Sequence, residues 1–133
     1  MANIVPDSFK TDLLGGVFDF DSGGSTFRLA LYTDISGFST STTAYTTTNE
    51  VSSSGTNYTA GGNTLTNNGV SVSSNIAFVD FADLTFSSVT LTADSALIYK
   101  DTSNEAVLVL DFGGDKTATN GDFVIQFPTA DSS

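Results

Sequence analysis

The chain has 133 residues, enough for one domain with a buried core, and its 15 acidic side chains face only four basic ones, giving a net charge of −11. Nucleic acids and anionic membranes are both bound by clustered Lys and Arg, so this balance argues against direct contact with either. The chain lacks cysteine and histidine, which excludes disulfides, thiolate zinc sites and a histidine-based catalytic triad.

Neither end of the sequence resembles an export or membrane segment. The first ten residues, "MANIVPDSFK", lack the apolar core of a secretory signal, and no apolar run approaches the ~20 residues of a membrane span. We therefore expect the protein to be made and folded in a cytoplasm. The last residues, "PTADSS" (128–133), are expected to form a frayed tail.

One short helix is predicted near the N-terminus. It follows an arm at residues 1–7 and spans residues 8–14 in "PDSFKTDLLGG", with Asp7 or Ser8 as the capping residue. The glycine pair Gly15-Gly16 is expected to supply the left-handed stop.

The helix is predicted to carry an apolar face made of Phe9, Leu13 and Leu14. Two turns of helix are not stable alone, so this face must dock on something. It either caps one end of its own domain or packs on a neighbouring subunit. All three residues are therefore candidate interface residues.

The rest of the chain is predicted to form strands and turns. Apolar residues alternate in "TFRLALYT" and in "VSVSS", where Val70 and Val72 are expected to point inward. The alternation in "IAFVDF" changes phase, so a bulge or turn near Ala77 is expected. A second phase slip falls at Ser87-Ser88 in "DLTFSSVTLT".

The C-terminal half contains the clearest predicted hairpin, in which "SALIYKD" and "EAVLVLDF" flank the turn signal "DTSN". Its strands, near 96–99 and 106–112, are almost continuously apolar, as in the middle of a sheet buried on both faces. Asn120-Gly121 predicts a turn before the last strand, "DFVIQF". The predicted fold class is all-β: a single β-sandwich or jelly-roll-like domain over residues 1–133, with one short N-terminal helix.

The acidic residues suggest two chemistries. A carboxylate pair could in principle hydrolyse a glycosidic bond, with Asp80, Asp83 or Asp111 as candidates. Most acids, however, lie at strand ends and turns where Asp bonds to nearby amides, so no catalytic residue and no enzymatic activity is predicted. Glycine-bearing loops could form a weak, non-essential calcium site without EF-hand spacing, and no metal or other cofactor is assigned. The candidate calcium ligands are Asp19, Asp21, Asp111, Asp115 and Asp122.

A hydroxyl-rich segment, "AYTTTNEVSSSGTNYTAGG" (44–62), is predicted to be an edge strand and long loop that is structured by hydrogen bonding and exposed to a neighbour. Glu50, alone among neutral residues, is expected to anchor the segment by accepting backbone amides or by pairing with an arginine. Tyr45 and Tyr58 are either partly buried strand residues whose phenols reach water, or part of a surface that contacts protein or stacks on a sugar. All three residues are candidate interface residues.

Five segments, in this order and spacing, resemble the small virion structural proteins of tailed bacteriophages and related prophages. They are "SFKTDLLGGVFDF", "FRLALYT", "AYTTTNEVSSSGTNYTAGGNTL", "VDFADLTFSS" and "ALIYKD". The resemblance covers residues 8–127 and is most specific at "YTTTNEVSSSGTNYTAGG" followed by "ALIYKD".

The resemblance implies a non-enzymatic part of the particle. The first expectation is a capsid decoration (cement) protein on the virion head, bound to the outer surface of the major capsid protein lattice and stabilising it. Its partners would be the major capsid protein and copies of itself, arranged as oligomers around local symmetry axes. The alternative is a tail, baseplate or fibre component, or a carbohydrate-binding adhesion module.

Overall fold

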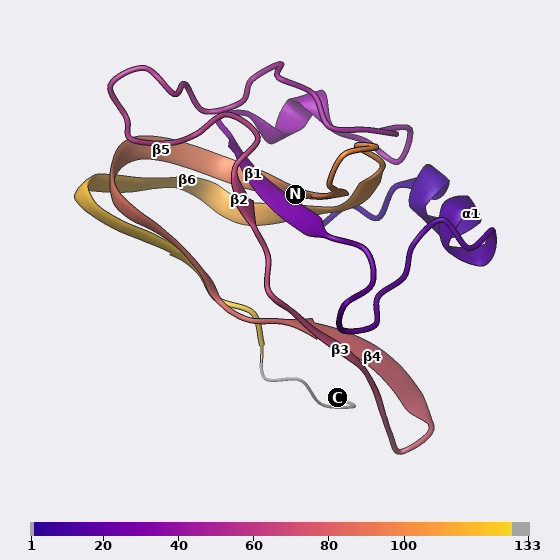
Figure 1. Ribbon diagram of the computed structural model, residues 1–133. Coiled ribbons are helices and arrows are strands. Elements are labelled where there is room, and N and C mark those ends of the chain that lie inside the picture. The colour runs from indigo at the N-terminus through magenta and orange to yellow at the C-terminus, as the bar shows by residue number, and fades with distance from the viewer. Residues whose placement is uncertain (1, 129–133) are drawn as a thin grey trace.

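The computed structural model describes residues 2–128 and shows strands arranged in two antiparallel sheets beside one short helix (Figure 1). The elements are α1 (Asp7–Leu14), β1 (Phe27–Tyr32), the 3-10 turn η1 (Ile35–Gly37), β2 (Asn63–Thr64), β3 (Asn67–Ser73), β4 (Ile76–Phe81), β5 (Leu84–Lys100) and β6 (Ala106–Ile125). One sheet has the order β2-β1-β5-β6, and β3 and β4 form the other. The predicted all-β, sandwich-like fold with one N-terminal helix is confirmed.

The four-stranded sheet is buried on both faces at its centre. One face carries Leu29, Leu31 and Ile98 in a large apolar cluster, and the other carries Tyr32 and Leu97 in a second cluster. The predicted two-sided burial is confirmed for residues 96–99, which are all buried. In β6, Leu108 and residues 110–112 are only half-buried, so that strand lies nearer the edge of the core.

An aromatic cluster connects the N-terminal segment to the first face of the sheet. The Phe20 and Phe27 rings stack with their centroids 4.7 Å apart, and Phe27 meets Phe81 of β4 edge to face at 5.7 Å. Phe9 of α1 packs on Phe18 at 5.1 Å. These contacts place α1 against its own domain, which is the first of the two predicted arrangements.

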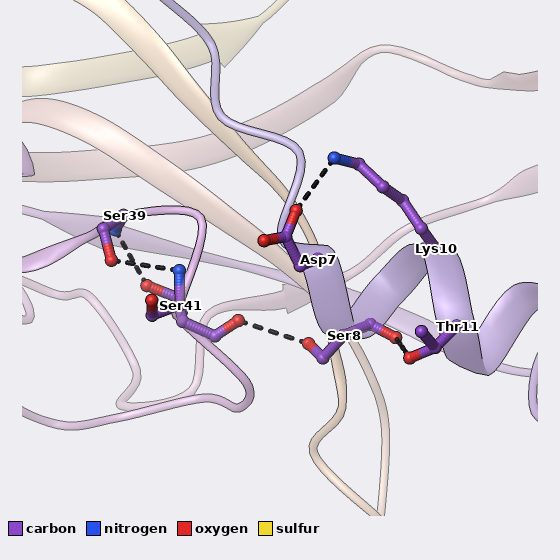
Figure 2. Close-up of polar contacts among 7 residues, drawn as sticks. Asp7, Ser8, Lys10, Thr11, Ser39 and Ser41 are labelled. Atoms are coloured by element: carbon purple, nitrogen blue, oxygen red, sulfur yellow. Dashed lines mark hydrogen bonds and ion pairs between the residues drawn. The ribbon is translucent and has the colours of Figure 1, made fainter.

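The ends of α1 differ from the prediction. Pro6 is the N-cap residue, and no side chain caps the helix, so the prediction of Asp7 or Ser8 as cap is wrong. Both side chains bond elsewhere: Lys10 Nζ donates to Asp7 Oδ1 at 2.9 Å, and Ser8 Oγ donates to the carbonyl of Thr42 at 3.2 Å (Figure 2). At the other end Gly15 keeps a right-handed conformation and Gly16 is left-handed, with φ of +80°. One glycine of the predicted pair therefore supplies the left-handed stop.

The β3–β4 hairpin projects away from the four-stranded sheet (Figure 1). Its turn lies at Ser74-Asn75, and the pairing runs without a break from Ser73 to Gly69, so the bulge or turn predicted near Ala77 is absent from the described strands. A register shift lies instead between Asn67 and Gly69. The inward orientation predicted for the valines of β3 is also wrong, since both are exposed.

The β5–β6 hairpin is confirmed at its turn, residues 101–104. The phase slip at Ser87-Ser88 is confirmed as a register shift between Phe86 and Val89. The turn predicted at Asn120-Gly121 is wrong, because β6 continues to Ile125. Asn120 has a left-handed φ of 48°, and it lies at a register shift in the pairing of β5 with β6, between Ala118 and Gly121.

The N-terminal arm lies along β6. The backbone N–H groups of Ile4 and Val109 each donate to the other's carbonyl at 2.9 Å, and the amide of Asp111 donates to the side chain of Asn3 at 2.8 Å. Of the predicted tail, residues 129–133 lie outside the described part of the chain. No helix within residues 2–128 has the length and apolar character needed to cross a membrane.

Candidate functional site

The chain has four tyrosines, and all of them meet where the segment 33–62 crosses the four-stranded sheet. The Tyr45 and Tyr99 rings stack with centroids 4.7 Å apart. The Tyr32 hydroxyl donates to the carbonyl of Thr46 at 2.7 Å. Two tyrosines therefore come from the sheet and two from the segment, although they are far apart in the sequence. We call these four side chains and Glu50 the tyrosine clasp.

Glu50 is the central acceptor of the tyrosine clasp. Its Oε2 accepts from the Tyr45 hydroxyl at 2.6 Å, and its Oε1 accepts from the Tyr58 hydroxyl at 2.8 Å and from the Gly61 amide at 2.6 Å. The prediction that Glu50 accepts a backbone amide is confirmed. Hydrogen bonds to an ionised acceptor are among the stronger ones in proteins, so one carboxylate holds three points of the segment.

The clasp also joins the segment to β1 and β5. The Tyr58 hydroxyl accepts the amide of Leu31 at 3.0 Å, and the Tyr99 hydroxyl donates to the carbonyl of Gly61 at 2.6 Å. Arg28 of β1 donates to the carbonyls of Gly61 and Gly62. The predicted pairing of Glu50 with an arginine is thus replaced by arginine contacts with backbone carbonyls of the same segment.

The phenols of the clasp are held neutral. Burial raises the pKa of Tyr32, Tyr45, Tyr58 and Tyr99 above the usual value for tyrosine, and the nearby Glu50 carboxylate raises each pKa further because it disfavours a second negative charge. A neutral phenol can donate a hydrogen bond, and here each hydroxyl donates to a carboxylate or carbonyl oxygen. The arrangement is suited to fixing backbone rather than to moving protons.

We expect Glu50→Gln to lower the free energy of unfolding by about 2 kcal/mol, because the charged acceptor is lost and the amide NH₂ has to face a hydroxyl or N–H donor. Urea-induced unfolding at neutral pH measures the change. Tyr45→Phe is the matched control, since it removes one donor and leaves the carboxylate in place, and it should cost less. Equal stability of Glu50→Gln and the unmodified protein would mean that the carboxylate does not anchor the segment.

The six predicted interface residues fall into two separate groups. Tyr45, Glu50 and Tyr58 belong to the clasp, and the Tyr58 side chain is only 3% exposed, so a sugar could not stack on its ring unless the segment opened. Phe9 is partly buried against the core. Leu13 and Leu14 are 43% and 91% exposed, so the predicted single apolar face does not include Leu14. Contact of these residues with a partner stays a prediction.

The acidic residues proposed for catalysis or calcium mostly bond within the chain. Asp80 accepts from the Asn68 side chain at 2.7 Å, and Asp83 accepts the Phe127 amide at 2.8 Å. The amide of Gly113 donates to Asp111 and lowers the pKa of that carboxyl below its usual range. Among residues 2–128 no three His, Cys, Asp or Glu side chains gather as a metal site would require. The weak calcium site stays a prediction.

Sequence reasoning missed an apolar groove beside the projecting hairpin. The groove encloses about 810 Å³. Its lining includes Val5, Leu13, Val70, Val79 and Phe127, and residues of β5 and β6 form part of it. The missed signal was the alternation in β3, whose valines were assigned to the core. Val70 is 50% exposed and Val72 is 73% exposed.

Comparison of the chain with protein-family models, with curated proteins and with solved structures found no match.

Proposed function

We propose that this chain is a structural component of a tailed-bacteriophage particle, namely a decoration protein on the outer surface of the head. The sequence resemblance over residues 8–127 supports the particle, and the all-β fold suits a part that acts by contact. The structural observation that carries the proposal is the distribution of exposed apolar side chains.

Seven large hydrophobic residues are exposed on the N-terminal arm, α1 and the β3–β4 hairpin. They are Val5, Leu13, Leu14, Val70, Val72, Ile76 and Val79. Four of them, namely Val5, Leu13, Val70 and Val79, line the groove described above, so these four form a shared surface rather than scattered single side chains. Surfaces of this kind on a soluble domain are typical of sites that another protein covers.

The tyrosine clasp supports the same function in a different way. It ties a long segment that is rich in serine and threonine to the sheet through neutral phenols and the Glu50 carboxylate. A segment fixed in this way loses little conformational freedom when a neighbour binds to it, which favours binding. Decoration of a shell requires such rigid, repeated contacts.

Phage heads that lack this protein test the proposal. We expect them to release their DNA at a lower temperature than complete heads, and the purified protein should restore the difference and bind in many copies per head. Heads of equal heat resistance would contradict the stabilising role. Imaging that finds only a few copies, located on the tail, would contradict placement on the head.

A pair of variants sharpens this experiment. Leu14→Asp should weaken binding to the heads about tenfold without unfolding the protein, because the side chain is almost fully exposed on α1. Thr119→Asp is the control, since Thr119 is exposed on β6, outside the N-terminal arm, α1, the β3–β4 hairpin and the segment 33–62. Equal binding by both variants would remove α1 from the contact with the shell.

A further inference from the structure

The β3–β4 hairpin has one apolar face that its own domain covers only at the base. Residues opposite each other on two antiparallel strands share a face, so the pairing of Val70 with Val79 and of Val72 with Ala77 places all four on the same side. The stripe begins next to the buried Phe81 and ends at Val72, which is 73% exposed. It therefore extends the hydrophobic core outward into solvent.

A two-stranded ribbon is only marginally stable in water unless its apolar face is covered. Within the described part of the chain, β3 and β4 pair only with each other and both outer edges lack a partner strand. Exposed edges in monomers are usually protected by charged side chains or proline. This hairpin has neither from Asn67 to Val79. These features indicate that the outer half of the hairpin is covered in the working protein.

The charge distribution identifies what covers it. The chain carries a net charge of −11, yet residues 51–79 contain no charged side chain. A basic partner would be attracted to the acidic side chains elsewhere on the surface, and not to this uncharged hairpin. Two copies of this chain, in contrast, repel each other everywhere except across an uncharged surface. An uncharged apolar face on a strongly acidic chain therefore fits a second copy.

We propose that two copies of this chain dimerise through the β3–β4 hairpin, with the faces formed by Val70, Val72, Ala77 and Val79 packed on each other across a two-fold axis. A face that is apolar along its length is complementary to itself, as an isologous contact requires. The inference shares one assumption with the proposed function, namely that another protein chain covers this apolar surface.

Sedimentation of the purified full chain over a range of concentrations tests the proposal. We expect a monomer–dimer equilibrium that Val72→Asp weakens at least about 100-fold, because an unpaired carboxylate would enter the apolar contact once from each copy. Ser71→Asp is the matched control, because Ser71 is the neighbouring exposed residue on the opposite face of the same strand and pairs with Phe78. It should dimerise like the unmodified chain. Both substituted side chains are exposed, so all three proteins should unfold at similar urea concentrations when they are compared at a protein concentration low enough for each to be monomeric.

Salt provides a second measurement. Raising the ionic strength should strengthen the dimer, since screening reduces repulsion between two acidic copies and leaves an apolar contact in place. A monomer at every concentration, a dimer that Val72→Asp leaves intact, or equal loss in both variants would overturn the proposal. These results are independent of the particle experiments: a dimer absent from phage heads would contradict only the proposed function, and a head-bound monomer would contradict only this inference.

Discussion

Gly62→Ala is expected to lower the free energy of unfolding by more than about 4 kcal/mol, or to prevent folding. An added Cβ would lie 1.8 Å from the carbonyl oxygen of Leu29 and 2.6 Å from its carbonyl carbon, both in the backbone of β1. The φ of Gly62 is +76°, which an alanine adopts only at a cost. Neither the central strand nor the segment that Arg28 and the tyrosine clasp hold beside it has room to move.

Gly55→Ala is the matched control for this experiment. Gly55 has nearly the same φ, +73°, but an added Cβ would meet nothing within 4 Å. It should therefore show the conformational cost alone, about 1 kcal/mol. Urea-induced unfolding of the two variants separates the cost of the steric clash with β1 from the cost of a positive φ for alanine. Similar losses for both variants would mean that the segment does not lie as close to β1 as the structure shows.

Raising the pH above about 10 is expected to destabilise the protein steeply. In the unfolded chain a tyrosine ionises near pH 10, whereas burial keeps Tyr32 and Tyr58 protonated in the folded chain. Because the folded pKa is the higher one, the stabilisation is complete below pH 10 and is lost as the pH rises toward the folded pKa. Each of these two buried tyrosines contributes a loss of about 1.4 kcal/mol per pH unit in this range. Tyr45 adds less because it is half-exposed and solvent screens it.

Two measurements check the alkaline prediction. Tyrosinate absorbance should rise together with the loss of near-ultraviolet circular dichroism, since these phenols ionise only when the clasp opens. In Tyr58→Phe the fall in stability with pH should be less steep by about one proton, even though the variant is less stable at neutral pH. Ionisation of the buried tyrosines near pH 10 with the fold intact would contradict the structure of the clasp.

Hydrophobic alternation predicted the strands well and their orientation poorly. In β1 the continuous burial of Leu29 through Tyr32 follows from a central position in the sheet. The valines of β3 alternate equally clearly but point to solvent. Alternation shows which side chains share a face, whereas the covering of that face depends on elements elsewhere in the chain. The alternation in β3 therefore could not predict that the hairpin is exposed.

Part of the clasp could be predicted, and part could not. A single carboxylate among hydroxyl and glycine residues indicated an acceptor of amides, and Glu50 does accept the Gly61 amide. The meeting of Tyr45 with Tyr99 depends on the segment crossing the β5–β6 turn, where the Tyr45 amide donates to the carbonyl of Asn104, and no local pattern contains that contact. Asn120 illustrates the reverse case. Its left-handed backbone suited a turn, but the continuing ladder with β5 uses it within the strand.

The pairing of β1 with β5 also sets an order of events during synthesis. Phe27 pairs with Lys100, so β1 lacks its main partner until most of the chain has been made, since the earlier strand β2 offers it only two paired residues. In contrast, β5 and β6 are joined by a short turn and can pair as soon as both exist. Closing the long connection between β1 and β5 carries an entropic cost that the local hairpin avoids. We therefore expect the β5–β6 hairpin to form early and the N-terminal half, tyrosine segment included, to join it as a late and slower step.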